Sequence, residues 1–169
     1  NSNCFVVPPL RFATESCLVM EEAVKAGMPV LLVSAGQAGA TAPASIAGAV
    51  AQALSEVVAG LIYVNAMVPG HPCIVGTWPF VSDLRTGAMS GGSGEQGLLT
   101  AACAQMLRHF DLPGGAASGM ADSKMPDAQS GYEKGSTAVL AGLAGLNLVY
   151  EAAGMHASLL GFCLESLII

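Results

Sequence analysis

Short apolar runs that alternate with helical patterns are the feature that most constrains the fold of this chain. Val30–Val33 is a continuous run of β-branched residues and leucine, which is typical of a buried parallel strand. Three further strands are predicted at Cys73–Gly76, Ala116–Gly119 and Leu146–Tyr150. Strands that alternate with helices predict an α/β fold with a parallel sheet.

Helical patterns lie between these strands, at about 14–26, 43–67, 93–110 and 128–144. Ser93 with Gln96 forms a capping-box pattern, and Asp127 is a suitable cap for the fourth helix. Residues 1–13 have no clear pattern and are expected to be irregular. The segment 156–169 is expected to be helical.

The loops that follow the strands are long, polar and rich in glycine, whereas the loops that precede them are tight. This asymmetry matches a (β/α) TIM barrel, in which the chemistry lies at the carboxyl ends of the strands. A full barrel takes about 250 residues. The 169 residues here are therefore expected to form a single domain or a fragment, 1–169, that covers about half a barrel and corresponds to the C-terminal half of a barrel enzyme.

Composition excludes several classes of protein. The most apolar stretch, 44–68, contains Gln52, Glu56 and Asn65 and has no basic flank, so no membrane span is expected. The net charge is −6 and no basic patch is present, which argues against a nucleic-acid partner. Five cysteines without a CxxC motif, in a chain with no signal-peptide pattern, predict reduced thiols and a cytoplasmic protein.

Charge is concentrated in the stretch 119–134, although the chain has only 18 charged residues. The polar and aromatic side chains there are Asp122, Lys124, Asp127, Gln129, Tyr132, Glu133 and Lys134. Carboxylates beside an aromatic ring could hold a methylated cation. Alternatively, a lysine near two carboxylates would brace the loop. The position after a predicted strand favours function for at least some of these residues.

The loop after the second predicted strand carries two further candidate features. Arg85 could bind a substrate carboxylate, or it could pair with Asp83 and stiffen the loop. The rings of Trp78 and Phe80 could bind a quaternary ammonium group, or they could pack beneath the loop.

The sequence GGSGEQ at 91–96 opens a helix, where backbone amides attract anions, but its spacing favours a simple turn followed by a cap. Glu95 in the first turn disfavours phosphate there. His71 with Cys73 is a possible metal pair, but zinc needs a third protein ligand and the other histidines are distant in sequence. No metal is expected.

Seven motifs together resemble one known family. They are GATAP at 39–43, PGHPCIVGT at 69–77, DLRTGA at 83–88, GGSGEQ at 91–96, ADSKMPDAQSGYEK at 121–134, LAGLN at 143–147 and the pair Glu165-Ser166. In this order they look like the trimethylamine:corrinoid methyltransferases. The resemblance runs from Leu10 to the last residue, and members of the family are much longer than this chain.

The resemblance implies a TIM barrel and a methyl transfer. The methyl donor would be a methylated amine such as trimethylamine or glycine betaine. The acceptor would be the cob(I)alamin cofactor of a separate corrinoid protein, which would dock above the mouth of the barrel. A homo-oligomer is expected, and the enzyme would contribute positioning and electrostatics.

Roles for individual residues follow from this resemblance. The catalytic residues would be Asp122, Asp127 and Glu133, whose negative charges would lie near the cationic substrate. The substrate would be bound by Arg85, Trp78, Gln129 and Tyr132. The glycines Gly91, Gly92 and Gly94 would leave room for the corrinoid.

Pyrrolysine, which some members use to activate a tertiary amine, does not occur in this sequence. If an ordinary residue takes its place, quaternary amines such as glycine betaine are favoured over trimethylamine. Two other hypotheses stay open. One is a non-catalytic module that binds a small cation or assembles with other subunits. The other is a different TIM-barrel enzyme that uses GGSGEQ to bind a phosphorylated metabolite.

Overall fold

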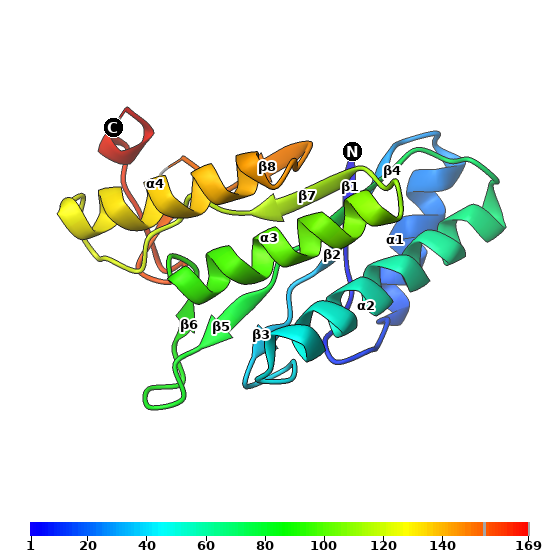
Figure 1. Ribbon diagram of the computed structural model, residues 1–169. Helices are drawn as coiled ribbons and strands as arrows, with labels where there is room; N and C mark the ends of the chain where they lie inside the picture. Colours follow the sequence, from blue (N-terminus) through cyan, green and yellow to red (C-terminus); the bar gives the residue numbers. More distant parts are fainter. Residues whose placement is uncertain (154, 169) are drawn as a thin grey trace.

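The computed structural model describes residues 1–153 and 155–168 (Figure 1). The helices are α1 (Thr14–Lys25), α2 (Ile46–Met67), α3 (Gly94–His109), α4 (Ala128–Leu143) and the 3-10 helix η1 (Glu165–Leu167). The strands of the main sheet are β1 (Ser2–Phe5), β2 (Val30–Ser34), β4 (Cys73–Thr77), β7 (Gly114–Ala117) and β8 (Leu148–Tyr150). The short strands are β3 (Gln37–Ala38), β5 (Phe80–Ser82), β6 (Met89–Ser90), β9 (Met155–His156) and β10 (Gly161–Phe162).

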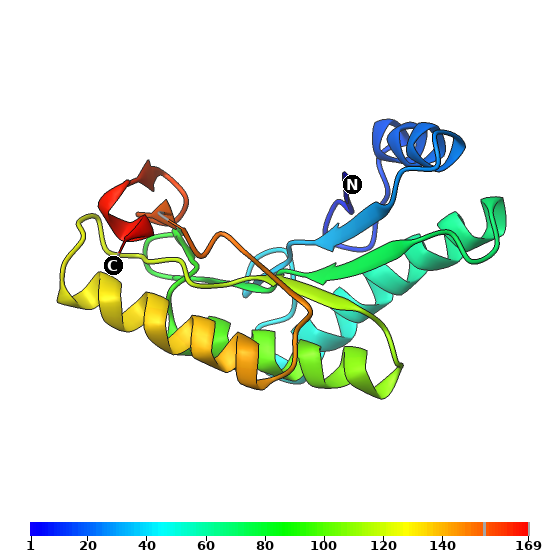
Figure 2. The same cartoon turned by 90° about the horizontal axis from the view of Figure 1, so that it is seen from above.

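The main sheet has five strands in the order β1-β2-β4-β7-β8, and every neighbouring pair is parallel. This spatial order is also the chain order, and a helix lies in each of the four connections between neighbouring strands. Successive helices contact one another, so they line one face of the sheet (Figure 2). The predicted α/β fold with a parallel sheet is therefore confirmed. A parallel sheet whose spatial order follows the chain order is compatible with part of a (β/α) barrel, and the TIM barrel itself stays a prediction.

The sheet is packed on both faces. In β2, Val30 and Leu32 turn towards α1 and α2, where they join a cluster with Met20 and Val64. Leu31 alternates with them and faces the opposite side, which is not covered by helices. This alternation follows from the period of two along a strand.

Helix α2 packs a stripe of small and branched side chains against β2 and β4, and Glu56 lies within this stripe with 2% of its surface exposed. The carboxylate accepts hydrogen bonds from the Ser34 hydroxyl at 2.5 Å, the Leu10 amide at 2.8 Å and the Gln52 side chain at 3.0 Å. By length and composition alone α2 would suffice to cross a bilayer, and one such helix is weak evidence for a span. The expectation of no membrane segment stays a prediction.

The helix starts follow the capping patterns in the sequence. The Ser93 side chain accepts a hydrogen bond from the Gln96 amide, and Asp127 accepts one from the Ser130 amide. Both predicted caps are thus confirmed. The second long helix begins later than expected, with Ser45 as its cap.

Two expectations are wrong. Residues 2–5, expected to be irregular, form β1, because Cys4 packs into the core between the sheet and α1 while the backbone pairs with β2. The segment 156–168, expected to be helical, contains β9, β10 and only the short η1. A regular helix cannot form there because three successive residues, Ala157, Ser158 and Leu159, have positive φ. These residues form the turn between β9 and β10. Ile169, at the end of the expected helix, lies outside the described residues.

Candidate functional site

A cavity of about 320 Å³ lies on the uncovered side of the sheet, at the carboxyl ends of its strands. It is lined by Phe5, Ala35, Gln37, Trp78, Phe80, Met89, Ala117, Met120, Glu151, Met155 and Leu159. These residues come from the ends of β1 and β7 and from the segments that follow β2, β4 and β8. This is where parallel α/β sheets place their binding sites.

Trp78 is the central aromatic residue of this cavity. It directly follows β4, and its backbone amide donates to the carbonyl of Ser34 at 2.8 Å, which extends the pairing with β2. The indole ring is 9% exposed and packs against Tyr150 with ring centroids 5.2 Å apart. Phe5 meets it edge-on at 5.9 Å. The strand ends thus bring three rings from distant parts of the sequence together.

Few polar groups belong to this cavity or to the rings packed against it. Among the residues that the structure describes, nothing accepts a hydrogen bond from the indole Nε1 of Trp78, and the buried hydroxyl of Tyr150 has no partner. Burial raises the pKa of Tyr150, so its hydroxyl stays protonated at neutral pH. Glu151 adds a carboxylate to the lining. Ring faces, methionine thioethers and one carboxylate suit a small cation that carries methyl groups.

The acidic side chains of the stretch 119–134 hold the loop before α4 in place. Glu133 accepts hydrogen bonds from the amides of Asp122 at 2.7 Å and Ser123 at 3.2 Å. Asp122 in turn accepts from the Gly91 amide at 2.8 Å and from the Ser90 hydroxyl. These bonds tie the loop after β7 to the loop after β6.

Asp127 completes this network as the cap of α4. It accepts from the Ser130 amide and from the Ser123 hydroxyl, each at 2.9 Å, and these bonds hold the pKa of the Asp127 carboxyl below its usual value. None of the three predicted catalytic carboxylates lines the aromatic cavity. The geometry gives them a structural task, and their catalytic roles stay predictions.

Of the predicted substrate-binding residues, the structure brings only Trp78 to the aromatic cavity. The Arg85 guanidinium is exposed, 3.5 Å from Asp83, whose carboxylate also accepts from the Arg85 amide at 2.9 Å. Gln129 donates to Glu133 at 2.7 Å. Tyr132 is 76% exposed on α4. Substrate binding by Arg85, Gln129 and Tyr132 therefore stays a prediction that the geometry of this chain does not support.

The three predicted corrinoid-facing glycines differ in their surroundings. A Cβ on Gly92 would lie 3.0 Å from the Asp122 amide and from Glu133, and one on Gly91 would lie 3.0 Å from Met120. A Cβ on Gly94 would meet nothing within 4 Å. The space beside Gly91 and Gly92 is thus occupied by the protein itself, and only Gly94 adjoins open space.

Sequence reasoning missed most of the cavity lining. Glu151 directly follows the predicted strand that ends at Tyr150, whose ring packs against Trp78, and this position is a signal that could have identified both residues. Phe5 was hidden in the segment expected to be irregular. No motif marks the methionines Met89, Met120 and Met155. The sequence does not distinguish a methionine that lines a cavity from one that packs in the core. Among the described residues no three His, Cys, Asp or Glu side chains are grouped to hold a metal ion.

The fold and the cavity define the class of this chain, an α/β protein with a parallel sheet and a cavity at the carboxyl ends of its strands. Residues 1–169 match the family described as trimethylamine methyltransferase (MTTB), and the chain belongs to that family.

Relatives with assigned activities are similar to nearly the whole chain. A glycine betaine methyltransferase of Desulfitobacterium hafniense is 37% identical over 87% of this chain, which is 31% of the relative. The trimethylamine methyltransferase MttB2 of Methanosarcina mazei is 35% identical over 95% of this chain and 32% of its own length. The trimethylamine methyltransferase MttB of D. hafniense is 34% identical over 89% of this chain. The chain thus spans about a third of the length of these relatives.

Proposed function

We propose that this chain forms part of the wall of a TIM-barrel enzyme that moves a methyl group from a methylated amine to the corrinoid cofactor of a partner protein. The observation that carries the proposal is the aromatic cavity at the carboxyl ends of the strands, with Trp78 between Phe5 and Tyr150. Family membership and the two substrates in the names of the relatives support the same chemistry.

The cavity residues position the methylated nitrogen in this proposal. The rings attract the cation through their negative faces, and Glu151 adds a carboxylate whose field acts over a short distance in surroundings with little water. In the transfer, the bond between the methyl carbon and nitrogen breaks and the amine leaves with the electron pair. The corrinoid supplies the Co(I) nucleophile, so the chain needs no nucleophile of its own.

A quaternary amine with an oxygen acceptor fits this cavity better than trimethylamine. A quaternary nitrogen needs no prior activation as a leaving group, and pyrrolysine does not occur in these 169 residues. The buried Nε1 of Trp78 and hydroxyl of Tyr150 are donors without acceptors in the described structure. A carboxylate such as that of glycine betaine would supply the missing acceptor.

The corrinoid protein would approach from the side of the strand ends, where Gly94 adjoins open space. The network of Asp122, Asp127 and Glu133 would then fix the shape of the loops at the mouth. A cytoplasmic homo-oligomer with free thiols belongs to the same proposal, and all five cysteines are unpaired in the structure.

Binding of a quaternary amine tests the cavity directly. Calorimetry with tetramethylammonium and glycine betaine should show saturable binding to the chain. Trp78→Leu should weaken it about tenfold, because a cation–π contact contributes roughly 1–2 kcal/mol when desolvated. Phe110→Leu is the matched control, since Phe110 is 54% exposed at the end of α3. Glu151→Gln, which keeps the shape and removes the charge, should also weaken binding.

Three outcomes separate the hypotheses. Amine binding together with methyl transfer to a reduced corrinoid protein supports the enzyme, whereas binding without transfer supports the non-catalytic cation-binding module. No binding, or equal binding by wild type and Trp78→Leu, contradicts a substrate role for the cavity. The phosphate hypothesis gains no support from the geometry, because Ser93 already caps α3 and Glu95 lies in the first turn.

A further inference from the structure

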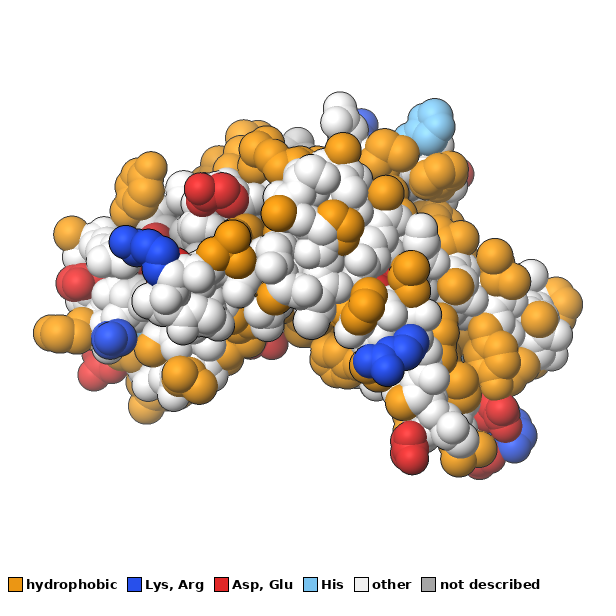
Figure 3. Space-filling view, turned by 90° about the horizontal axis from the view of Figure 1, so that it is seen from below, with side chains coloured by type: hydrophobic (Ala, Val, Ile, Leu, Met, Phe, Trp, Pro, Cys, Tyr) orange, Lys and Arg blue, Asp and Glu red, His pale blue; other side chains and the backbone are white. Residues whose placement is uncertain are grey.

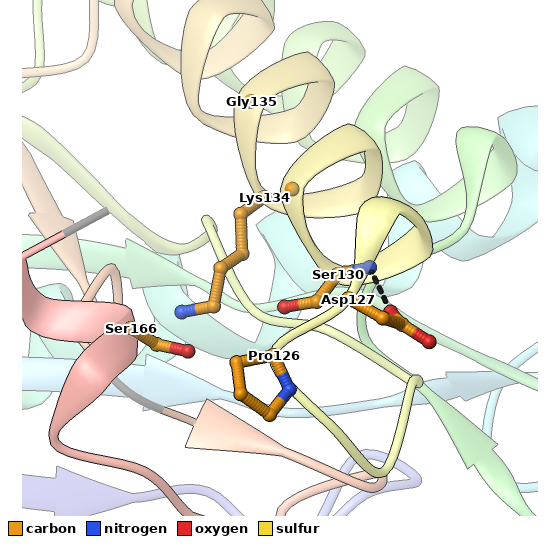
Figure 4. Close-up of a pocket in the computed structure, with 7 residues that line it drawn as sticks. Pro126, Asp127, Ser130, Lys134, Gly135 and Ser166 are labelled. Atoms are coloured by element: carbon orange, nitrogen blue, oxygen red, sulfur yellow. Dashed lines mark hydrogen bonds between the residues drawn. The ribbon is translucent and has the colours of Figure 1, made fainter.

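A second cavity, of about 250 Å³, lies between the N-terminal part of α4 and η1 (Figure 4). It is lined by Pro126, Asp127, Ser130, Gly131, Lys134, Gly135 and Ser166. None of these residues lines the aromatic cavity. The predicted roles of the stretch 119–134 leave Lys134 without a function, although it is one of the few basic residues of the chain.

The ammonium of Lys134 is buried without a counter-charge in hydrogen-bond contact. Its Nζ is shielded from water, and among the residues that the structure describes no group accepts a hydrogen bond from it. Desolvation accordingly lowers the pKa of Lys134. An unpaired buried ammonium is costly, and an anion would remove that cost. The methylenes of a lysine have several rotatable bonds, so the ammonium can move a short distance to meet a ligand.

Two hydroxyl groups lie near this ammonium. In Figure 4 the side chains of Lys134, Ser130 and Ser166 point towards the same space above Pro126. Ser130 is 3% exposed and comes from the same helix as Lys134. These hydroxyls give the cavity polar groups besides the ammonium.

Ser166 is held in position by a buried histidine. The Ser166 hydroxyl is 2.5 Å from Nε2 of His156, whose Nδ1 is 3.2 Å from the carbonyl oxygen of Ser123. A carbonyl oxygen can only accept, so Nδ1 carries the proton. His156 is 2% exposed. The wall formed by η1 is therefore fixed by side chains rather than by a regular helix.

The acidic groups around the cavity are engaged elsewhere. The carboxylate of Asp127 accepts from the Ser130 amide and the Ser123 hydroxyl, each at 2.9 Å. Glu165 accepts from the Cys163 thiol at 2.9 Å. Neither carboxylate bonds to Lys134, and among the described residues no other group accepts a hydrogen bond from its ammonium.

We propose that this cavity binds a small monocarboxylate of about the size of acetate, with the Lys134 ammonium as its counter-charge and the Ser130 hydroxyl as a second donor. A phosphate dianion fits less well, because the donors are few and Asp127 is among the lining residues, so a second negative charge would be repelled. Pro126, Gly131 and Gly135 offer carbon surface for a short alkyl group. A monocarboxylate matches both the polar donors and the carbon surface of this lining.

Titration with sodium acetate at constant ionic strength tests the site. Chemical shifts of the lysine ε-groups, measured by NMR, should change saturably at Lys134, and the bound anion should raise the pKa of Lys134. Lys134→Met removes the charge and keeps an unbranched apolar side chain. It should weaken acetate binding about tenfold or more, because a hydrogen bond to a charged group is lost. Lys124→Met is the matched control, since Lys124 is exposed in the loop that precedes α4.

The proposal is overturned if acetate causes no saturable change at Lys134, or if Lys134→Met and Lys124→Met bind acetate as tightly as the wild type. Tighter binding of phosphate than of acetate would overturn the choice of ligand class. Ser130→Ala provides a second variant with a smaller expected loss, of a few fold, should Lys134→Met fail to fold. The test involves neither an amine nor a corrinoid, so its result is independent of the proposed methyl transfer.

Discussion

Strand β2 is held by its side chains, whereas β7 and the loop after it are held mainly by hydrogen bonds and by the side chains of neighbours. Val30, Leu31, Leu32 and Val33 are all fully buried. The sequence of β7 is GGAA, which has no side chain larger than a methyl group. A Cβ on Gly115 would lie 3.0 Å from the ring of Tyr150, so the bulk comes from β8 instead.

Figure 3 shows apolar side chains spread over the underside of the molecule, with the few charges in small groups. In the stretch 119–134, where the sequence concentrates charge, the carboxylates of Glu133 and Asp127 accept hydrogen bonds from backbone amides. The comparison indicates that β2 is stabilised by the packing of its side chains, whereas β7 and the loop after it are stabilised by a hydrogen-bonded network.

The largest loss of stability is expected in the tightly packed strand β2. Leu32→Ala should lower the free energy of unfolding by about 3–5 kcal/mol, because it leaves a cavity between β2 and α2. Leu32 is fully buried, and a Cβ on Gly60 would lie 2.9 Å from it. Urea denaturation measures the change. Leu18→Ala, at a side chain that is 54% exposed on α1, should change it by less than about 1 kcal/mol. Equal losses in both variants would contradict the comparison.

The next largest loss of stability is expected in the hydrogen-bonded loop after β7. Glu133→Ala should lower the free energy of unfolding by about 1–3 kcal/mol, because the amides of Asp122 and Ser123 lose their acceptor. Hydrogen exchange at these two amides should accelerate more than exchange in β2. The control is Glu95→Ala at an exposed position of α3. Unchanged exchange at both amides would show that Glu133 does not hold the loop.

These regions also differ in how far the sequence predicted them. The apolar run at 30–33 and the caps Ser93 and Asp127 were predicted correctly, because a buried strand and a helix start are local patterns. Strand β1 was not predicted, since it is fixed by pairing with β2. The end of the chain was misjudged as helix, because the positive φ values at 157–159 occur at residues other than glycine.

The aromatic cavity lies at the strand ends, where the sequence predicted a site, but most of its lining residues were not predicted. Of the proposed residues, Trp78 lines the cavity, whereas the carboxylates of 119–134 bond to backbone amides. A sequence shows that charge is concentrated but not which donors it meets, because those donors come from segments brought together by folding.

A pair of glycine variants sharpens the comparison further. Gly92→Ala should lower the free energy of unfolding by about 1–2 kcal/mol, because the new methyl group would crowd Glu133 and the Asp122 amide at 3.0 Å. Gly94→Ala, beside open space, should cost nothing measurable. Thermal or urea denaturation compares the two. If Gly94→Ala destabilises as much as Gly92→Ala, crowding is not the cause.

The smallest expected effect is the pH dependence of the cap of α4. Hydrogen bonds from the Ser130 amide and the Ser123 hydroxyl lower the pKa of Asp127 in the folded protein. A lowered folded pKa means that the stabilisation is fully present above the unfolded pKa, about 3.9. It is lost as pH falls through the folded value.

Asp127→Asn keeps the cap geometry and removes the titration. The difference in melting temperature between wild type and Asp127→Asn should therefore be largest near neutral pH and shrink below about pH 4. Asp111→Asn, at an exposed carboxylate after α3, is the control variant. A difference that stays constant down to pH 2 would mean that the Asp127 charge does not stabilise α4, and that the hydrogen bonds alone, which asparagine can also accept, hold this end of the network.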